Sequence, residues 1–130
     1  MVLEILAKML KMGKILLITN ARELWVETIA SIMMPRVELF IRQYIPVISA
    51  AYFYESTFPY NTDEWKMRTF MDLWGMEDVI DPTPECLLNL IVVGDNDYEM
   101  NAGKNFNEKM KHGKTCILKL VKLQDNPSPC

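Results

Sequence analysis

Apolar residues recur along the chain with two different spacings, and each spacing predicts a different kind of element. Within residues 2–12 they lie three or four positions apart, which predicts an amphipathic helix that ends at Gly13. Residues 14–19 and 45–49 form short apolar runs that predict buried strands. The run at 87–93 includes four large aliphatic residues in succession, so we expect this strand to be buried on both faces, as in a parallel sheet.

Helical signals fill the segments between the predicted strands. Asn20, followed three residues later by Glu23, predicts a capping box at the start of a helix that extends to about Met33. Pro35 is expected in the first turn of the next helix, because its fixed φ suits that position. Residues 51–61 are aromatic and irregular, and we expect a loop that folds back on the domain or serves as a lid or partner contact.

The second half of the chain continues the alternation of helices and strands. A helix is expected to begin at Asn61 or Thr62, another to cover about 97–111, and a last strand to cover 115–120. Alternation of this kind predicts right-handed crossovers and a parallel sheet between helices. We therefore expect an α/β fold, a three-layer Rossmann-like parallel sheet of about four strands flanked by helices.

Length and composition are those of one domain. The chain has 130 residues, of which 50% are hydrophobic and 24% are charged, which is typical of a globular protein. We expect residues 1–123 to form the α/β domain. The polar, proline-containing residues 124–130 are expected to form a flexible tail.

Charge, hydropathy and cysteine content exclude several classes of partner. With a net charge of −3 and no run of Lys and Arg, the chain does not resemble a nucleic-acid binder. No apolar run approaches the roughly 20 residues that span a bilayer, so we expect no membrane insertion. Cys86, Cys116 and Cys130 are odd in number and lack a Cys-x-x-Cys spacing, which indicates free thiols in a reducing, intracellular compartment.

Three carboxylates follow the strand at 87–93. Gly94 ends that strand, and Asp95, Asp97 and Glu99 come within the next five residues. Ligands of open α/β sheets bind just past the carboxyl ends of the strands, and carboxylate oxygens suit Mg²⁺. The alternative is that these acids form the solvated first turn of a helix, where the helix dipole favours negative charge.

Three landmarks also follow one another in an order that is familiar from one superfamily. A strand ends in Thr19, Lys66 lies early in a helix, and a later strand ends in Gly94 and Asp95. This order resembles the second, third and fourth motifs of the haloacid dehalogenase-like (HAD) phosphohydrolases, over roughly residues 1–120. Three short segments look like segments of HAD-like proteins of protists: Thr19-Asn20-Ala21, Trp25-Val26-Glu27 and Met34-Pro35-Arg36.

The resemblance implies a role for each landmark residue. In HAD enzymes a strand-end Thr hydrogen-bonds the transferring phosphoryl group, and a Lys neutralises charge on that group and on the nucleophile. Thr19, with Asn20 beside it, and Lys66 match these phosphate-site positions. Asp95, together with Asp97 or Glu99, would hold Mg²⁺. These are contributions to electrostatic positioning of a phosphoryl transition state. Each residue also has a purely structural alternative. Thr19 would simply end its strand and begin the following cap, and Lys66 would be an exposed lysine on a helix.

The first motif of the family, an Asp-x-Asp that supplies the covalent nucleophile and the general acid/base, has no counterpart here. The only Asp-x-Asp is Asp95-Asn96-Asp97, and no aspartate precedes Thr19. We therefore expect this polypeptide alone to be a pseudoenzyme without phosphatase activity, binding no cofactor or only weak Mg²⁺.

The missing motif has a structural consequence, because in the HAD fold its strand lies between the strands of the second and fourth motifs. Either strand 14–19 pairs directly with strand 89–93, or another chain donates the central strand. Direct pairing is the interpretation we favour, and it gives the order 115–120, 89–93, 14–19, 46–48.

Two functions follow from the sequence. The first is a non-catalytic HAD-like module that acts as a structural or interaction subunit of a larger intracellular assembly, with other protein subunits as partners. The alternative is a fragment of a split or truncated Mg²⁺-dependent HAD phosphatase, completed by a partner that supplies the nucleophile strand.

Overall fold

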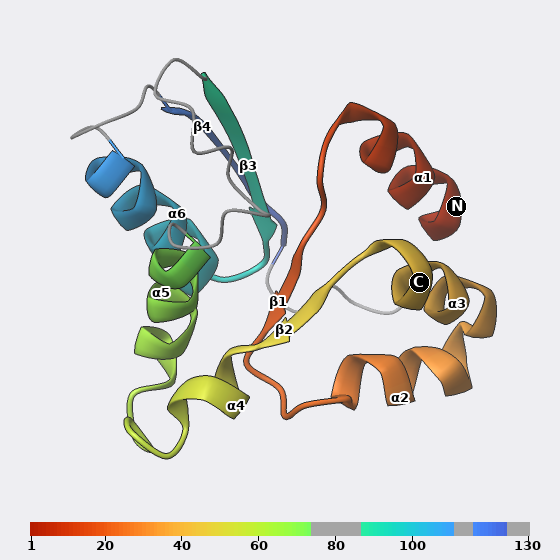
Figure 1. Ribbon diagram of the computed structural model, residues 1–130, viewed down its shortest axis with the longest axis horizontal. Coiled ribbons are helices and arrows are strands. Elements are labelled where there is room, and N and C mark those ends of the chain that lie inside the picture. Colours follow the sequence, from red (N-terminus) through yellow and green to blue (C-terminus); the bar gives the residue numbers. More distant parts are fainter. Residues whose placement is uncertain (74–86, 111–115, 125–130) are drawn as a thin grey trace. The chain divides into compact units, whose positions relative to one another are not determined.

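The computed structural model describes residues 1–73, 87–110 and 116–124 (Figure 1). The chain falls into two compact units, residues 1–65 and 66–130. Of the predicted tail, only Gln124 belongs to the described residues, and Cys86 and Cys130 lie outside them. No helix in the described ranges combines the length and the apolar composition that crossing a bilayer requires.

The first unit consists of helices around a short pair of parallel strands. Strands β1 and β2 pair in register from Leu17↔Val47 to Thr19↔Ser49. The elements in chain order are α1 (Val2–Met12), β1 (Leu17–Thr19), α2 (Trp25–Met33), α3 (Pro35–Tyr44), β2 (Val47–Ser49), α4 (Ala50–Tyr54) and the start of α5 (Thr62–Leu73). The helix predicted at 2–12, the Pro35 start and the strand positions are confirmed, although both strands are only three residues long.

Two apolar clusters hold the first unit together. In the first cluster, Val37 and Ile41 of α3 are buried together with Ile45, the residue that follows this helix. Six partly buried residues pack against them: Leu3, Leu6, Ile15, Leu17, Phe40 and Val47. In the second cluster, Trp65 is buried against Ala50 and Ala51, and its indole Nε1 donates a hydrogen bond to the Phe58 carbonyl at 2.8 Å. The clusters use the apolar stripe of each helix, as the sequence spacing predicts.

The predicted cap at Asn20 is wrong. Helix α2 begins at Trp25, after an N-cap residue, Leu24, that has φ 64° and makes no side-chain cap bond. The side chain of Asn20 is engaged elsewhere, because its Nδ2 donates to the Thr62 carbonyl at 2.9 Å. Asn20 therefore does not cap the helix that follows it in the sequence, and its amide instead binds a residue 42 positions away.

The predicted loop at 51–61 is wrong over its first residues. Helix α4 covers Ala50–Tyr54, and the Ser49 hydroxyl caps it by accepting a hydrogen bond from the Tyr52 backbone at 3.1 Å. Ala50 and Ala51 are small enough to be buried at its start. A serine at the end of one element thus begins the next helix, since a Ser side chain satisfies a free N–H of the first turn.

The described part of the second unit consists of one long strand pair, a helix on one face of that pair, and residues 66–73 of α5 beside this helix. Strands β3 (Leu88–Gly94) and β4 (Cys116–Lys122) run parallel and pair over their full length, from Leu88↔Cys116 to Gly94↔Lys122. Helix α6 (Asp97–Met110) packs on them (Figure 1). The approach is close: a Cβ at Gly103 would lie 3.0 Å from Val92 Cγ2.

The parallel α/β character is confirmed, whereas the single sheet of about four strands stays a prediction. Among the described residues, β1 pairs with β2 and β3 pairs with β4, as two separate two-stranded sheets. A pairing of 14–19 with 89–93 would join the two units and stays a prediction. The strand lengths favour the pairs that form within each unit. Each seven-residue strand finds a seven-residue partner, whereas the three-residue β1 offers a ladder only three residues long.

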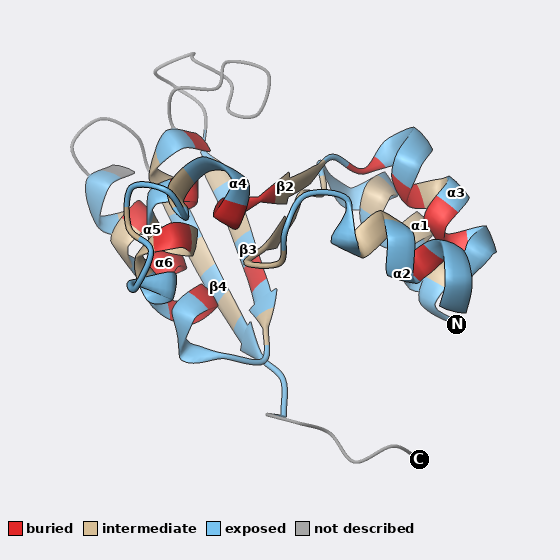
Figure 2. Ribbon diagram, turned by 90° about the horizontal axis from the view of Figure 1, so that it is seen from below, coloured by how far each residue is buried: buried red, intermediate tan, exposed pale blue. Residues whose placement is uncertain are grey.

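The strand at 87–93 is not buried on both faces. Val92 is buried, whereas its neighbours Ile91 and Val93 are exposed, and half-buried and exposed residues alternate along β4 as well (Figure 2). Helix α6 covers only one face of the pair. The opposite face keeps apolar side chains in solvent.

Candidate functional site

The carboxyl ends of β1 and β2 bring two hydroxyl side chains together. Thr19 and Ser49 are direct partners in the parallel register. The Thr19 Oγ1 accepts a hydrogen bond from the Ala21 backbone at 3.0 Å, and the Ser49 Oγ donates to the Ala21 carbonyl at 2.6 Å. Both hydroxyls therefore hold the turn that leaves β1. Sequence reasoning missed Ser49, although its position before two alanines is a cap signal.

Asn20, the second predicted phosphate-site residue, has an unsatisfied oxygen. Its Oδ1 is buried and has no hydrogen-bond partner among the described residues, while its Nδ2 donates to the Thr62 carbonyl. A buried amide oxygen without a partner is costly and often marks a place where a donor binds. Thr19, Asn20 and Ser49 thus form a small polar edge in the first unit.

The second unit brings Lys66 into direct contact with Glu99. The Lys66 Nζ donates to Glu99 Oε1, and the two side chains are only 13% and 11% exposed. The other carboxylate oxygen, Oε2, accepts from the Asn96 backbone at 3.1 Å. Glu99 therefore ties helix α5 to the turn after β3. Its carboxylate is satisfied by protein groups on both oxygens.

Asp95 adds a second negative charge near Lys66. Burial lowers the pKa of the Lys66 ammonium below its ordinary value, and the charge of Asp95 opposes this by favouring the protonated form. Asp95 itself is exposed. The structure thus places Lys66, Asp95 and Glu99 in one cluster, whereas Thr19 and Asn20 belong to the first unit.

Asp97, the remaining predicted metal ligand, forms a surface ion pair. Its Oδ1 accepts a hydrogen bond from Lys122 Nζ at 2.8 Å, and this bond lowers the pKa of the Asp97 carboxyl. Nowhere in the described ranges do three His, Cys, Asp or Glu side chains gather as a metal-binding group. Weak Mg²⁺ binding by Asp95, Asp97 and Glu99 stays a prediction.

The thiol of Cys116 is free among the described residues, and burial raises its pKa. It lies at the start of β4, away from the carboxyl edge where Lys66 and Glu99 meet. It therefore adds nothing to that cluster.

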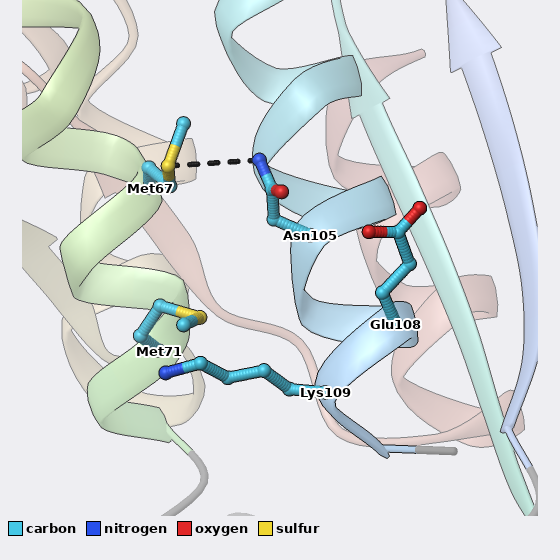
Figure 3. Close-up of a pocket in the computed structure, with 5 residues that line it drawn as sticks. All are labelled: Met67, Met71, Asn105, Glu108 and Lys109. Atoms are coloured by element: carbon cyan, nitrogen blue, oxygen red, sulfur yellow. Dashed lines mark hydrogen bonds between the residues drawn. The ribbon is translucent and has the colours of Figure 1, made fainter.

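A shallow pocket of about 240 Å³ lies between α5 and α6 in the second unit (Figure 3). Asn105 Nδ2 donates to the Met67 sulfur at 3.6 Å across it. The pocket is lined by Met67, Met71, Asn105, Glu108 and Lys109. Its walls are two thioethers and two exposed, opposite charges, so it carries no set of convergent catalytic groups. Sequence reasoning did not predict it.

Gly94 is the position where a substitution tests how tightly Glu99 is held. A Cβ at Gly94 would lie 2.6 Å from Glu99 Cγ and 2.8 Å from its Cβ. Because Lys66 and Asn96 fix the carboxylate, Glu99 has no room to move away. Gly94→Ala is therefore expected to lower the free energy of unfolding by about 1–3 kcal/mol, measured by urea denaturation.

The matched control is Gly13→Ala. A Cβ at Gly13 meets no atom within 4 Å, and its φ of 169° is extended backbone that any residue adopts. We expect no loss of stability from this change. If both alanine variants unfold at the same urea concentration, the tight fit around Glu99 is not real.

No family model, curated protein or solved structure matches the chain.

Proposed function

We propose that the chain is a non-catalytic α/β module of the HAD-like type that acts as a structural or interaction subunit of a larger intracellular assembly. The observation that carries the proposal is the open face of the β3–β4 sheet. Ile91 and Val93 on β3, and Ile117 and Val121 on β4, are between 43% and 47% exposed. Parallel sheets are ordinarily covered on both faces. A partner protein is expected to cover this one.

The register makes the open face continuous. Val93 faces Val121 across the ladder, and Ile91 faces Lys119, so these side chains lie on the same side of the sheet. Lys119 places one positive charge within an apolar surface. A partner surface that is apolar and carries a carboxylate opposite Lys119 fits this pattern.

The Lys66–Glu99 pair supports the non-catalytic part of the proposal. In an enzyme the lysine would neutralise a phosphoryl group, and the carboxylate would hold a metal ion directly or through water. Here each side chain satisfies the other inside a nearly buried site. The sequence also holds no Asp-x-Asp other than Asp95-Asn96-Asp97.

Site-specific photo-crosslinking tests the interaction surface. A photoreactive amino acid at Ile91 or Val121 is expected to form one discrete adduct with a partner protein in the source cells. The same amino acid at Lys104, which is exposed on α6, is expected to form none. Absence of an adduct from the sheet face, or equal adducts from all three positions, contradicts the proposal.

One observation favours the alternative, a fragment of a split phosphatase. Lys66, Asp95 and Glu99 lie together at the carboxyl end of β3, where such an enzyme would bind phosphate and Mg²⁺. In this case a second polypeptide, or an in-frame segment encoded upstream of Met1, supplies the nucleophile strand.

A phosphatase assay separates the two functions. With a generic aryl phosphate and Mg²⁺, we expect no turnover above the buffer rate from the pure chain. Metal-dependent turnover that Asp95→Asn abolishes, seen when a nucleophile-bearing partner is added, would establish the alternative. Turnover by the pure chain itself would exclude the non-catalytic proposal.

A further inference from the structure

Helix α1 exposes an apolar stripe that the core of its unit does not use. Four side chains three or four positions apart are between 37% and 82% exposed: Val2, Ile5, Met9 and Met12. Another side of the same helix supplies Leu3 and Leu6 to the cluster on α3. At 100° per residue the apolar surface of α1 is therefore wider than its contact with α3. The unused part of that surface forms a continuous strip along the helix.

Positive charge borders this strip. Lys8 precedes Met12 by four residues and follows Ile5 by three, so it lies directly beside the stripe. Lys11 lies farther around the polar face, and Glu4 is the only carboxylate on the helix. Within the described parts of the chain, neither lysine forms an ion pair with a carboxylate.

We propose that α1 binds the surface of a bilayer that contains anionic lipids. The helix would lie in the plane of the headgroups, with Ile5 and Met9 in the outer acyl region and Lys8 and Lys11 at lipid phosphates. Charge complementarity between the lysines and the lipid supplies the attraction, and the stripe supplies the apolar contact. Eleven residues are too short to span a bilayer. The proposal is independent of the interaction surface on β3–β4.

The composition of the stripe favours a lipid surface over a protein groove. Protein interfaces are anchored by Trp, Tyr or Arg side chains that fill fitted pockets. Helix α1 has none of these residues. Apolar side chains on one face and lysines on the polar face are instead the pattern of helices that lie in the plane of a bilayer surface.

Vesicle cosedimentation of the full chain tests the proposal. We expect binding to vesicles of equimolar phosphatidylserine and phosphatidylcholine, weaker binding at high salt, and none to phosphatidylcholine alone. Lys8→Gln with Lys11→Gln is expected to lower the partition coefficient by roughly 25-fold, about fivefold for each lysine. Ile5→Ser with Met9→Ser keeps both charges but removes the apolar contact, and it is expected to abolish binding.

A matched variant controls for net charge. Lys104→Gln with Lys109→Gln removes two exposed lysines from α6 and is expected to leave vesicle binding unchanged. Circular dichroism checks that every variant keeps its helices. Equal binding to both kinds of vesicle, no binding to either, or retention on polyglutamate without vesicle binding would overturn the proposal. The last result would assign α1 to an acidic protein.

Discussion

Replacing Lys66 by methionine is expected to lower the free energy of unfolding by roughly 3–5 kcal/mol at neutral pH. Methionine keeps much of the length of the side chain but removes the ammonium that meets Glu99. The carboxylate then stays in a site where it is only 11% exposed and keeps the hydrogen bond from the Asn96 N–H. An unpaired buried charge is costly, because the carboxylate gives up its hydration without gaining a cation. Urea denaturation at neutral pH measures the effect.

A double variant distinguishes a lost ion pair from lost packing. Lys66→Met combined with Glu99→Gln removes both charges, and the Gln oxygen still accepts from the Asn96 backbone. Most of the stability lost in the single variant is expected to return. If the double variant is as unstable as Lys66→Met, packing around the lysine stem rather than charge explains the loss.

The pH dependence of the Lys66→Met variant gives an independent check. Burial without a cation favours the protonated form of Glu99, so the folded variant takes up a proton at a higher pH than the unfolded chain, whose Glu titrates near about pH 4.3. The folded state then binds more protons in the window above that value. Its stability relative to wild type therefore rises as pH falls through this window. A penalty that stays constant down to about pH 5 would argue against an unpaired carboxylate.

The sequence predicts the order and type of most elements because each depends on a local pattern. The apolar spacing of α1, Pro35 at the start of α3 and the apolar runs of the strands all act within a few residues. Burial of β3 is different. Ile91 and Val92 are chemically alike, and only the position of α6 decides which of them is covered. No local pattern carries that information.

In the candidate site, too, some features can be predicted from the sequence and others depend on distant parts of the chain. Resemblance to a family places Lys66 and the acids after β3 in one site, and the structure brings Lys66, Asp95 and Glu99 together. The hydrogen bond between Lys66 and Glu99 joins residues 33 positions apart. The sequence does not predict it, because the sequence does not show which of the three acids pairs with the lysine. For Asn20 the local sequence predicts a helix cap that does not form, because its amide donates to the Thr62 carbonyl instead.

The second large effect is expected from Ile41→Ala in the core of the first unit. Ile41 is 6% exposed and is buried with Val37 and Ile45, against side chains of α1 and both short strands. Truncation removes apolar contact and leaves a cavity, because α3 is held by neighbours on more than one side. We expect the free energy of unfolding to fall by about 2–5 kcal/mol, measured by urea denaturation with tryptophan fluorescence.

Leu39→Ala is the matched control for this variant, because it lies on the same helix and loses a side chain of the same volume. Leu39 is 63% exposed, so little apolar surface is lost and no cavity forms. Alanine also has the better helix propensity, and we expect a change within about 0.5 kcal/mol. The contrast tests which side of α3 faces the core. If Leu39→Ala is the more destabilising of the two, α3 is rotated relative to the arrangement in which Val37, Ile41 and Ile45 form the buried cluster, and the docking of α1 on that helix must be revised with it.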